Sequence, residues 1–445
     1  MAVPSSIEQA IRPEDRYVAA FEMQDGHTLN GSNATVQGLR REAIQAFSML
    51  GIPTRKSEAW KYTSIEKALR HDYKIQGAGA PVPVSKQDIA QFLVPDLDSH
   101  VVVLTNGRFN DELSSIGTLP SGVVISGFAQ AAEAHPEIVN RHFAQIADFR
   151  AEPFTALNTA FTQDGLFIYI PRGVALEKPV QVVRLIHAHE DVMLQPRNLF
   201  VAEDGGAVRV IESEHALAGG KTFTNAVTEI YTGRHANVEY YKLEDSGEDA
   251  TLVDTTQAHQ EEDSVCSVYT FTFSGDIVRN NLSFLLNGEH CESHLYGLFL
   301  GRGRMHVDNH TLVDHATPNC NSNELYKGIL NDESTGVFNG KVFVRRDAQK
   351  TNAYQSNKSI VLTDRAKMYA KPELEIYADD VRCSHGATTG QLDPESIFYL
   401  RTRGITPQQA RAMLLLAFAR DVLDNVRIEP LRAALDEAVH ARFTG

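Results

Sequence analysis

The stretch VCSVYTFTFSGDIVRNNLSFLLNGEHCESHLYGLFL, which runs from Val265 to Leu300, decides the fold. Three runs rich in β-branched and aromatic residues are separated by Ser274-Gly275 and Asn287-Gly288, two pairs of residues that favour turns. No helical period of three or four residues crosses the stretch. It therefore predicts consecutive strands joined by turns.

The same character extends outward in both directions, from about Leu166 to Ala387. Further strand-like runs occur at Leu166–Ile170, Val180–Ile186, Val208–Ile211, Ala226–Tyr231, Val238–Leu243, Gly336–Val344 and Glu373–Tyr377. Asp204-Gly205 and Asn339-Gly340 predict further turns. This region is too long for one ordinary sandwich and lacks alternating helices, so we predict a parallel β-helix. Two fused sandwiches or cupin-like barrels are the alternative, because no tight repeat is visible.

Helical patterns flank this β-rich region on both sides. Before it, Leu39, Ala43 and Phe47 share a helical face, and Thr63 and Glu66 have the spacing of a capping box for a short helix. We therefore divide the chain into three parts: a mostly helical region with a mixed α/β segment at 1–155, a β-helix core at 156–387 and a C-terminal helical region at 388–445.

The C-terminal region carries the strongest helix signals. Thr406, Pro407 and Gln409 supply a cap, a first-turn proline and a reciprocal glutamine. Apolar residues then recur at three- and four-residue steps, which predicts one amphipathic face made of Ala410, Met413, Leu414, Ala417, Phe418 and Val422. Such a face needs an apolar cover, which this chain or a partner can provide.

Composition removes several classes of function. The 445 residues carry a formal charge of −15, which argues against nucleic acid or an anionic membrane as a partner. Ala412–Ala419 is the longest apolar run and is too short to span a bilayer, and Met1–Arg16 has no apolar signal core. Four cysteines are too few for a disulfide scaffold, so we expect a cytoplasmic protein.

Common catalytic motifs are missing from the sequence. It contains no Gly-x-x-x-x-Gly-Lys-Ser/Thr loop, no Gly-x-Gly-x-x-Gly and no Gly-x-Ser-x-Gly. The sequence therefore gives no support for three classes of enzyme that depend on these motifs: P-loop ATPases, nucleotide-dependent dehydrogenases and α/β-hydrolases.

Histidines gather in one part of the β-rich region, where five of the 17 fall between His290 and His315. On a strand, His306, Asp308 and His310 would point the same way. Imidazole and carboxylate ligands suit zinc or iron, so this triad is a candidate metal site. Polar residues on a solvated sheet face are the alternative.

A second candidate site is Cys383-Ser-His385, which follows the last predicted strand. A Cys-x-His pair on extended backbone places a thiol and an imidazole on one side. A metal or iron–sulfur site normally needs four ligands, so this pair is half a site. A catalytic Cys–His pair and a merely packed cysteine with a hydrogen-bonded histidine are the alternatives. Cys266, Cys291 and Cys320 are expected to be buried thiols.

Long motifs in three parts of the chain resemble the SufD members of the SufB/SufD family, which are scaffold proteins of the SUF iron–sulfur cluster assembly machinery. These motifs are Arg55–Thr63; His306–His315 with Asn323–Leu330 and Gly336–Lys341; and Glu373–Leu392 with Phe398–Arg401. At the position of a SufB glutamate that is thought to bind the cluster, this chain has Gly386, which favours SufD. The resemblance implies a right-handed parallel β-helix with helical segments at both ends.

The resemblance also implies partners and a function. The β-helix would pair with SufB, or with a second copy of this chain in isolation. The C-terminal helices would dock the ATPase SufC through Thr406, Pro407, Met413, Leu414, Ala417, Phe418 and Val422. His385, with Cys383 beside it, would hold a transient iron–sulfur cluster shared with SufB, and a flavin in the complex is a further expectation. No ligand role is carried over to His306, Asp308, His310 or His315.

Two enzymes remain as alternatives to a non-catalytic scaffold. A β-helix polysaccharide lyase or hydrolase would need a catalytic cluster on one face of the solenoid. A metallohydrolase would use His306, Asp308 and His310 to bind its metal ion.

Overall fold

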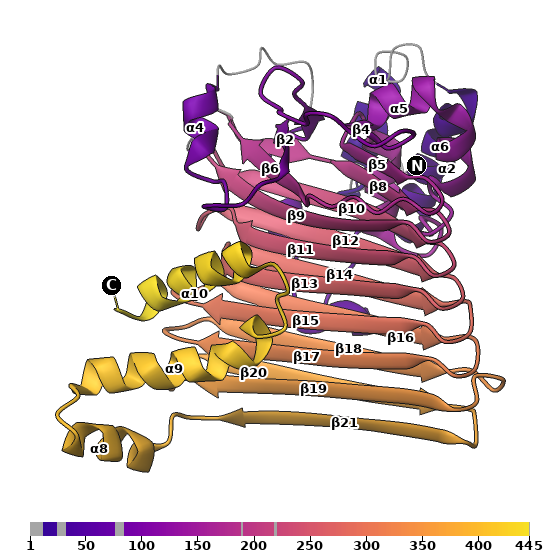
Figure 1. Ribbon diagram of the computed structural model, residues 1–445. Coiled ribbons are helices and arrows are strands. Elements are labelled where there is room, and N and C mark those ends of the chain that lie inside the picture. Colours follow the sequence, from indigo (N-terminus) through magenta and orange to yellow (C-terminus); the bar gives the residue numbers. More distant parts are fainter. Residues whose placement is uncertain (1–11, 25–32, 76–83, 188–189, 218–219, 445) are drawn as a thin grey trace, which may run out of the picture.

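The computed structural model describes residues 12–24, 33–75, 84–187, 190–217 and 220–444. Of the stretch Met1–Arg16, in which we looked for a signal core, residues 1–11 lie outside this description. Two long sheets face each other and make a parallel β-helix, with helices at its first coils and over one outer face (Figure 1). The predicted mainly β fold with flanking helices is confirmed.

From β8 onward, successive strands alternate between the two sheets, so this part of each sheet is built from every second strand. The first sheet contains β4 (Val124–Gly127), β5 (Leu166–Ile170), β8 (Arg197–Ala202), β10 (Thr222–Thr232), β12 (Ala250–Gln260), β14 (Ile277–Leu286), β16 (His306–His315), β18 (Thr335–Val344) and β20 (Lys367–Ile376), with β1 (Lys74–Ile75) and β7 (Val192–Leu194) beside it. The second contains β3 (Arg108–Phe109), β2 (His100–Thr105), β6 (Val180–Ile186), β9 (Ala207–Ala216), β11 (Asn237–Asp245), β13 (Val265–Ser274), β15 (Glu292–Gly301), β17 (Asn321–Leu330), β19 (Thr351–Val361) and β21 (Val381–Gly390).

Side chains alternate between the interior of the β-helix and its outer faces, as the two-residue period of a strand requires. In β14, Leu282, Phe284 and Leu286 point inward and join the apolar interior with Val268 and Leu295 of the opposite sheet. The strands pair in register from coil to coil, so each inward residue stacks on the inward residue of the neighbouring coil. The interior is therefore a set of columns that run along the long axis.

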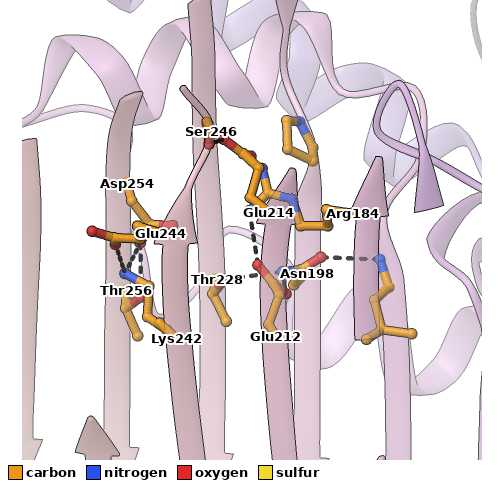
Figure 2. A network of polar contacts seen from close by, with 12 residues as sticks. Arg184, Asn198, Glu212, Glu214, Thr228, Lys242, Glu244, Ser246, Asp254 and Thr256 are labelled. Atoms are coloured by element: carbon orange, nitrogen blue, oxygen red, sulfur yellow. Dashed lines mark hydrogen bonds and ion pairs between the residues drawn. The ribbon is translucent and has the colours of Figure 1, made fainter. Parts of the chain in front are cut away.

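Part of the interior is charged, which the apolar strand signals did not predict. Arg184 lies 2.7 Å from Glu212 and 2.5 Å from Glu214, and all three side chains are buried (Figure 2). Further along the same interior, Lys242 lies 2.6 Å from Asp254. Burying ions is costly unless each is paired, and these pairs meet that requirement within the protein.

Helices cover the first coils and one outer face. The N-terminal helices are α1 (Asp15–Gln24), α2 (Ala34–Leu50), α3 (Glu66–Leu69), α4 (Lys86–Ala90), α5 (Phe128–Ala134), α6 (Pro136–His142) and α7 (Pro153–Phe161), with a 3₁₀ turn η1 at Glu58–Trp60. The C-terminal helices are α8 (Pro394–Thr402), α9 (Pro407–Leu423) and α10 (Glu429–Thr444), of which α9 and α10 pack on the outer face of the second sheet (Figure 1).

The local signals for two helices agree with the structure. Leu39, Ala43 and Phe47 lie in α2, which ends at Gly51 with φ of 69°, and Thr406 and Gln409 form the predicted capping box of α9. The turn predicted at Asn339-Gly340 is wrong, because both residues lie inside β18. Gly340 faces the interior, where an added Cβ would lie 2.4 Å from the Nε2 atom of Gln355. None of the helices in the described part of the chain is both long and apolar enough to cross a membrane.

The contact between α6 and the β-helix predicts how stability depends on pH. His142 of α6 is buried and packs against Tyr231 of β10, with ring centroids 4.6 Å apart. Burial lowers the pKa of His142 to about 4, whereas an unfolded histidine has a pKa of about 6.5. The unfolded chain therefore binds a proton more readily, and the stability that neutral His142 contributes is lost as pH falls from about 6.5 towards 4.

Between about pH 7.5 and about pH 5.0, the natural chain should lose about 2 kcal/mol more free energy of unfolding than His142→Gln does. Urea unfolding at both pH values measures this difference. His235→Gln, at an exposed position whose ion pair with Asp263 is open to water, is the control and should keep most of the natural pH dependence. Equal losses in the natural chain and in His142→Gln would contradict the assignment.

Candidate functional site

The last coil of the β-helix leaves a strand edge open. β21 pairs with β19 on one side and with no described strand on the other, and it forms the lower end of the stack in Figure 1. β20 likewise ends the first sheet after β18. Unpaired N–H and C=O groups along such an edge can pair with a strand from another chain.

Cys383 and His385 both lie on this edge strand. Cys383 pairs in register with Ala353 of β19, and His385 pairs with Gln355. Ala353 and Gln355 are buried and point into the interior, so the side chains of Cys383 and His385 lie on the inward side of the last coil. Cys383 packs against the small apolar cluster around Val342, whereas His385 is exposed. The structure thus places the two predicted ligands on one side of an open edge.

The chemistry of Cys383 argues against a self-contained catalytic pair. Burial raises the pKa of its thiol, opposed only by a hydrogen bond with the backbone of Ala353, and His385 does not act on it. The thiol therefore stays protonated near neutral pH in the free chain. A thiolate ligand would require an added positive charge, such as a metal ion, to lower this pKa.

In the described part of the chain, the pair belongs to no larger group of potential metal ligands. Within the described ranges, the only group of three potential metal ligands is Glu262, Asp263 and His290. Those three residues are exposed in a turn of the β-helix, and neither Cys383 nor His385 belongs to the group. Among the described residues, Cys383 and His385 thus belong to no complete set of metal ligands, and their role in a shared site stays a prediction.

Large apolar side chains are exposed around the same end of the molecule. They come from β19, from β20 and the residue after it, and from α8: Tyr354, Tyr369, Ile376, Tyr377, Phe398 and Tyr399. Exposed aromatic residues concentrated in one region are typical of protein–protein interaction surfaces.

The histidine motif on β16 takes part in a network of ion pairs and hydrogen bonds with its neighbours. His306, Asp308 and His310 do share the outer face of the first sheet, as predicted. Asp308 is buried and lies 2.6 Å from the guanidinium of Arg279, and His310 lies 3.0 Å from its other oxygen. Although burial alone would raise the pKa of Asp308, Arg279 and His310 hold it well below its usual range. Arg279 already balances the charge of this carboxylate, and among the described residues the triad forms no group of three potential metal ligands.

This network attaches the N-terminal region to the β-helix. The Thr63 hydroxyl contacts Asp308 and lies 2.8 Å from the Nε2 atom of His306. Arg279 donates to the carbonyl of Ala59 at 2.8 Å and its guanidinium lies 4.2 Å from the ring of Trp60. The predicted capping box of α3 is therefore wrong, because the Thr63 side chain binds β16 and caps no helix.

His315 has a different environment from the other motif histidines. It points into the interior, is fully buried and lies 2.9 Å from the Ser322 hydroxyl. Cys266, Cys291 and Cys320 are buried there as expected. Cys291 and Cys320 stack in neighbouring coils and both donate to the carbonyl of Gly288, a pairing that their separation in the sequence did not reveal.

Comparison with known proteins gives the family. The profile described as "SUF system FeS cluster assembly, SufBD core domain" matches residues 185–418, which include the whole β-helix edge and Cys383-Ser-His385. A second profile, "SufBD protein N-terminal region", matches residues 11–182. The chain belongs to the SufBD family.

Individual relatives place the chain near the SufD members of the SufBD family. The iron–sulfur cluster assembly protein SufD of Escherichia coli (strain K12) is 30% identical over 95% of this chain and 97% of its own length. A SufBD family protein of Synechocystis is 31% identical over 91% of this chain and 90% of its own length. SufD of Bacillus subtilis is 28% identical over 72% of this chain and 74% of its own length.

The C-terminal residues predicted to dock a partner divide into two groups in this SufBD protein. Val422 is fully buried against the second sheet, and Phe418 is half-buried, with its ring 4.1 Å from the ammonium of Lys327. Met413 is 48% exposed and Ala417 is exposed, while Leu414 is half-buried. Thr406 and Pro407 lie exposed at the start of α9.

The single amphipathic face predicted for α9 is therefore rotated in the structure. The buried residues of α9 that pack with the second sheet are Leu415, Ala419, Val422 and Leu423. Ala410 and Ala412 are also buried, so of the predicted face only Ala410 and Val422 are fully covered. The helical period was identified correctly, but in this apolar helix hydrophobic residues occur on both sides, so the pattern could not decide which side faces the protein's own core.

Breaking the Asp308 network should detach the N-terminal region of this SufBD protein from the β-helix. Asp308→Asn leaves the buried guanidinium of Arg279 without its charge partner, which should lower the free energy of unfolding by about 3–5 kcal/mol. Asp314→Asn, on the same strand beside the half-exposed Arg345, is the matched control and should cost no more than about 1 kcal/mol. Urea unfolding measures both variants, and similar losses would contradict the anchoring role.

Proposed function

We propose that this chain is a non-catalytic scaffold subunit that supports iron–sulfur cluster assembly in the cytoplasm. The observation that carries the proposal is the position of Cys383 and His385 on an unpaired edge strand, where the ligand set is incomplete. A second chain that pairs with this edge would bring its own ligands to the same place. The cluster would be transient and shared between the two chains.

SufB is the proposed partner at this edge. The exposed aromatic side chains around β20 and α8 provide apolar contact area, and the open strands provide backbone hydrogen bonds. Gly386 offers no carboxylate where SufB has a glutamate, so this chain depends on SufB for that ligand. In isolation the same edge would pair two copies of this chain, which SufB would displace.

SufC is the proposed partner at the C-terminal helices. Met413 and Ala417 face away from the β-helix, so they can contact another protein while α9 stays packed on its own core. ATP hydrolysis would belong to SufC. Only Gln391, Leu392 and Asp393 separate the end of β21 from α8, so movement of the docked helices would pull on the strand that carries Cys383 and His385.

Replacing His385 should reduce cluster assembly on the reconstituted complex with SufB and SufC. His385→Ala removes one ligand of the shared site, and the cluster bound per complex, measured by visible absorption and iron content, should fall at least tenfold. His235→Ala, an exposed histidine in a distant turn, is the control and should leave the yield unchanged. An unchanged yield in His385→Ala would refute the ligand role. The same absorption spectra test whether the assembled complex holds a flavin.

The docking proposal has its own test. The double variant Met413→Glu with Ala417→Glu should abolish SufC binding in gel filtration, because two charges would be buried in the interface, while stability changes by less than about 1 kcal/mol. Ala441→Glu, at an exposed position of α10, is the control. Retained SufC binding by the double variant would reject this surface. Deleting all of α9 is a poorer test, because it would also uncover the second sheet.

A further inference from the structure

A buried amide group lies directly behind the proposed ligand His385. Gln355 of β19 pairs in register with His385 of β21, so the two side chains occupy the same column in neighbouring coils, about 4.8 Å apart along the stack. Gln355 is only 3% exposed, and its Oε1 atom is sealed from solvent without a hydrogen-bond partner among the described residues. A buried amide oxygen without a partner is costly.

The orientation of this amide is fixed from the coil on its other side. The Nε2 atom of Gln355 donates to Glu324 of β17 at 2.9 Å, and Glu324 pairs in register with Gln355 and is buried. An ionised carboxylate only accepts hydrogen bonds, so while Glu324 is ionised Gln355 presents its NH₂ group to it and keeps its oxygen for another donor. Because burial raises the pKa of Glu324 to about 7, this orientation is favoured above that pH, and the test of the amide is made there.

The opposite sheet leaves room for the amide, because the residue that faces it is a glycine. Gly340 of β18 faces Gln355, and a Cβ at this position would lie 2.4 Å from Nε2 and 2.9 Å from Cδ of Gln355. Any side chain at position 340 would push the amide out of the column. The amide of Gln355 is thus bonded by Glu324, given room by Gly340 and placed next to His385.

We propose that Gln355 is a positioning residue whose Oε1 atom accepts a hydrogen bond from a ring N–H of His385. This contact would fix the tautomer of His385 and direct its other ring nitrogen, with its lone pair, towards the partner chain. Histidines that bind metals generally donate their second ring N–H to an oxygen in this way. The inference deepens the proposed function and rests on it for its biological meaning, whereas the hydrogen bond itself can be tested without a cluster.

The test measures the tautomer of His385 in the isolated full-length chain. Nitrogen-15 NMR of histidine-labelled protein distinguishes protonated from bare ring nitrogens, and His385→Gln identifies the resonances of this residue. We expect one predominant tautomer in the natural chain. Gln355→Leu should reduce the tautomer ratio roughly tenfold, the effect of losing about one net hydrogen bond. The exchange Glu324→Gln with Gln355→Glu should restore it, because the new carboxylate accepts from both neighbours.

Asn357→Leu is the matched control. Asn357 is another buried amide in the same strand, but its register partner is Ala387, which has no ring to orient. This variant should leave the His385 tautomer ratio unchanged. An equal effect of both leucine variants, or a natural ratio near one that Gln355→Leu does not alter, would overturn the proposal.

Cluster yield on the complex separates this inference from the proposed function. If the ligand role and the positioning role both hold, His385→Ala lowers the cluster bound per complex at least tenfold. Gln355→Leu then weakens the affinity of the complex for the cluster about 10- to 100-fold. Loss of the cluster in His385→Ala, together with an unchanged tautomer in Gln355→Leu, would refute only the positioning role. A tautomer that depends on Gln355, together with full cluster yield in His385→Ala, would refute only the ligand role.

Discussion

Each coil of the β-helix is held by backbone hydrogen bonds to the coil before it, in strict parallel register, and this stacking is the constraint on which the rest of the structure depends. A stack of this kind cannot satisfy its own ends. The N-terminal helices cover the first coils, and Asp308 with Arg279 and Thr63 ties the N-terminal region to a later coil. One edge of the last strand, β21, pairs with no described strand. The fold itself therefore creates the surface to which we assign the function.

Register also decides which residues meet. Residues about 30 positions apart in the sequence become neighbours, as with Glu324 and Gln355, which are 31 apart. The same relation brings Gln355 beneath His385 and stacks Cys291 beneath Cys320. A column of polar groups that leads from the interior to the edge strand therefore arises from three successive coils, although no short motif contains it.

The sequence was sufficient for the class of fold, and it named two candidate ligands that the structure places on one side of the edge strand. Alternating apolar runs predicted most strands, and the Cys-x-His spacing of Cys383-Ser-His385 identified the candidate ligands. It was not sufficient for register, because the coils share no repeated residues that would align them. For this reason the Glu324–Gln355 pair and the stacked cysteines were missed, and Thr63 was assigned to a helix cap when its partners lie on β16. The face of α9 was misjudged because apolar residues surround that helix.

The most direct test of the central claim is whether an imidazole of this chain binds the shared cluster. We would assemble the complex with nitrogen-15 histidine in this subunit alone, reduce the cluster and record pulsed electron paramagnetic resonance spectra. The account predicts a nitrogen-15 hyperfine coupling of a directly bound histidine, which disappears in His385→Ala. A cluster that forms in full yield without any such coupling would contradict it.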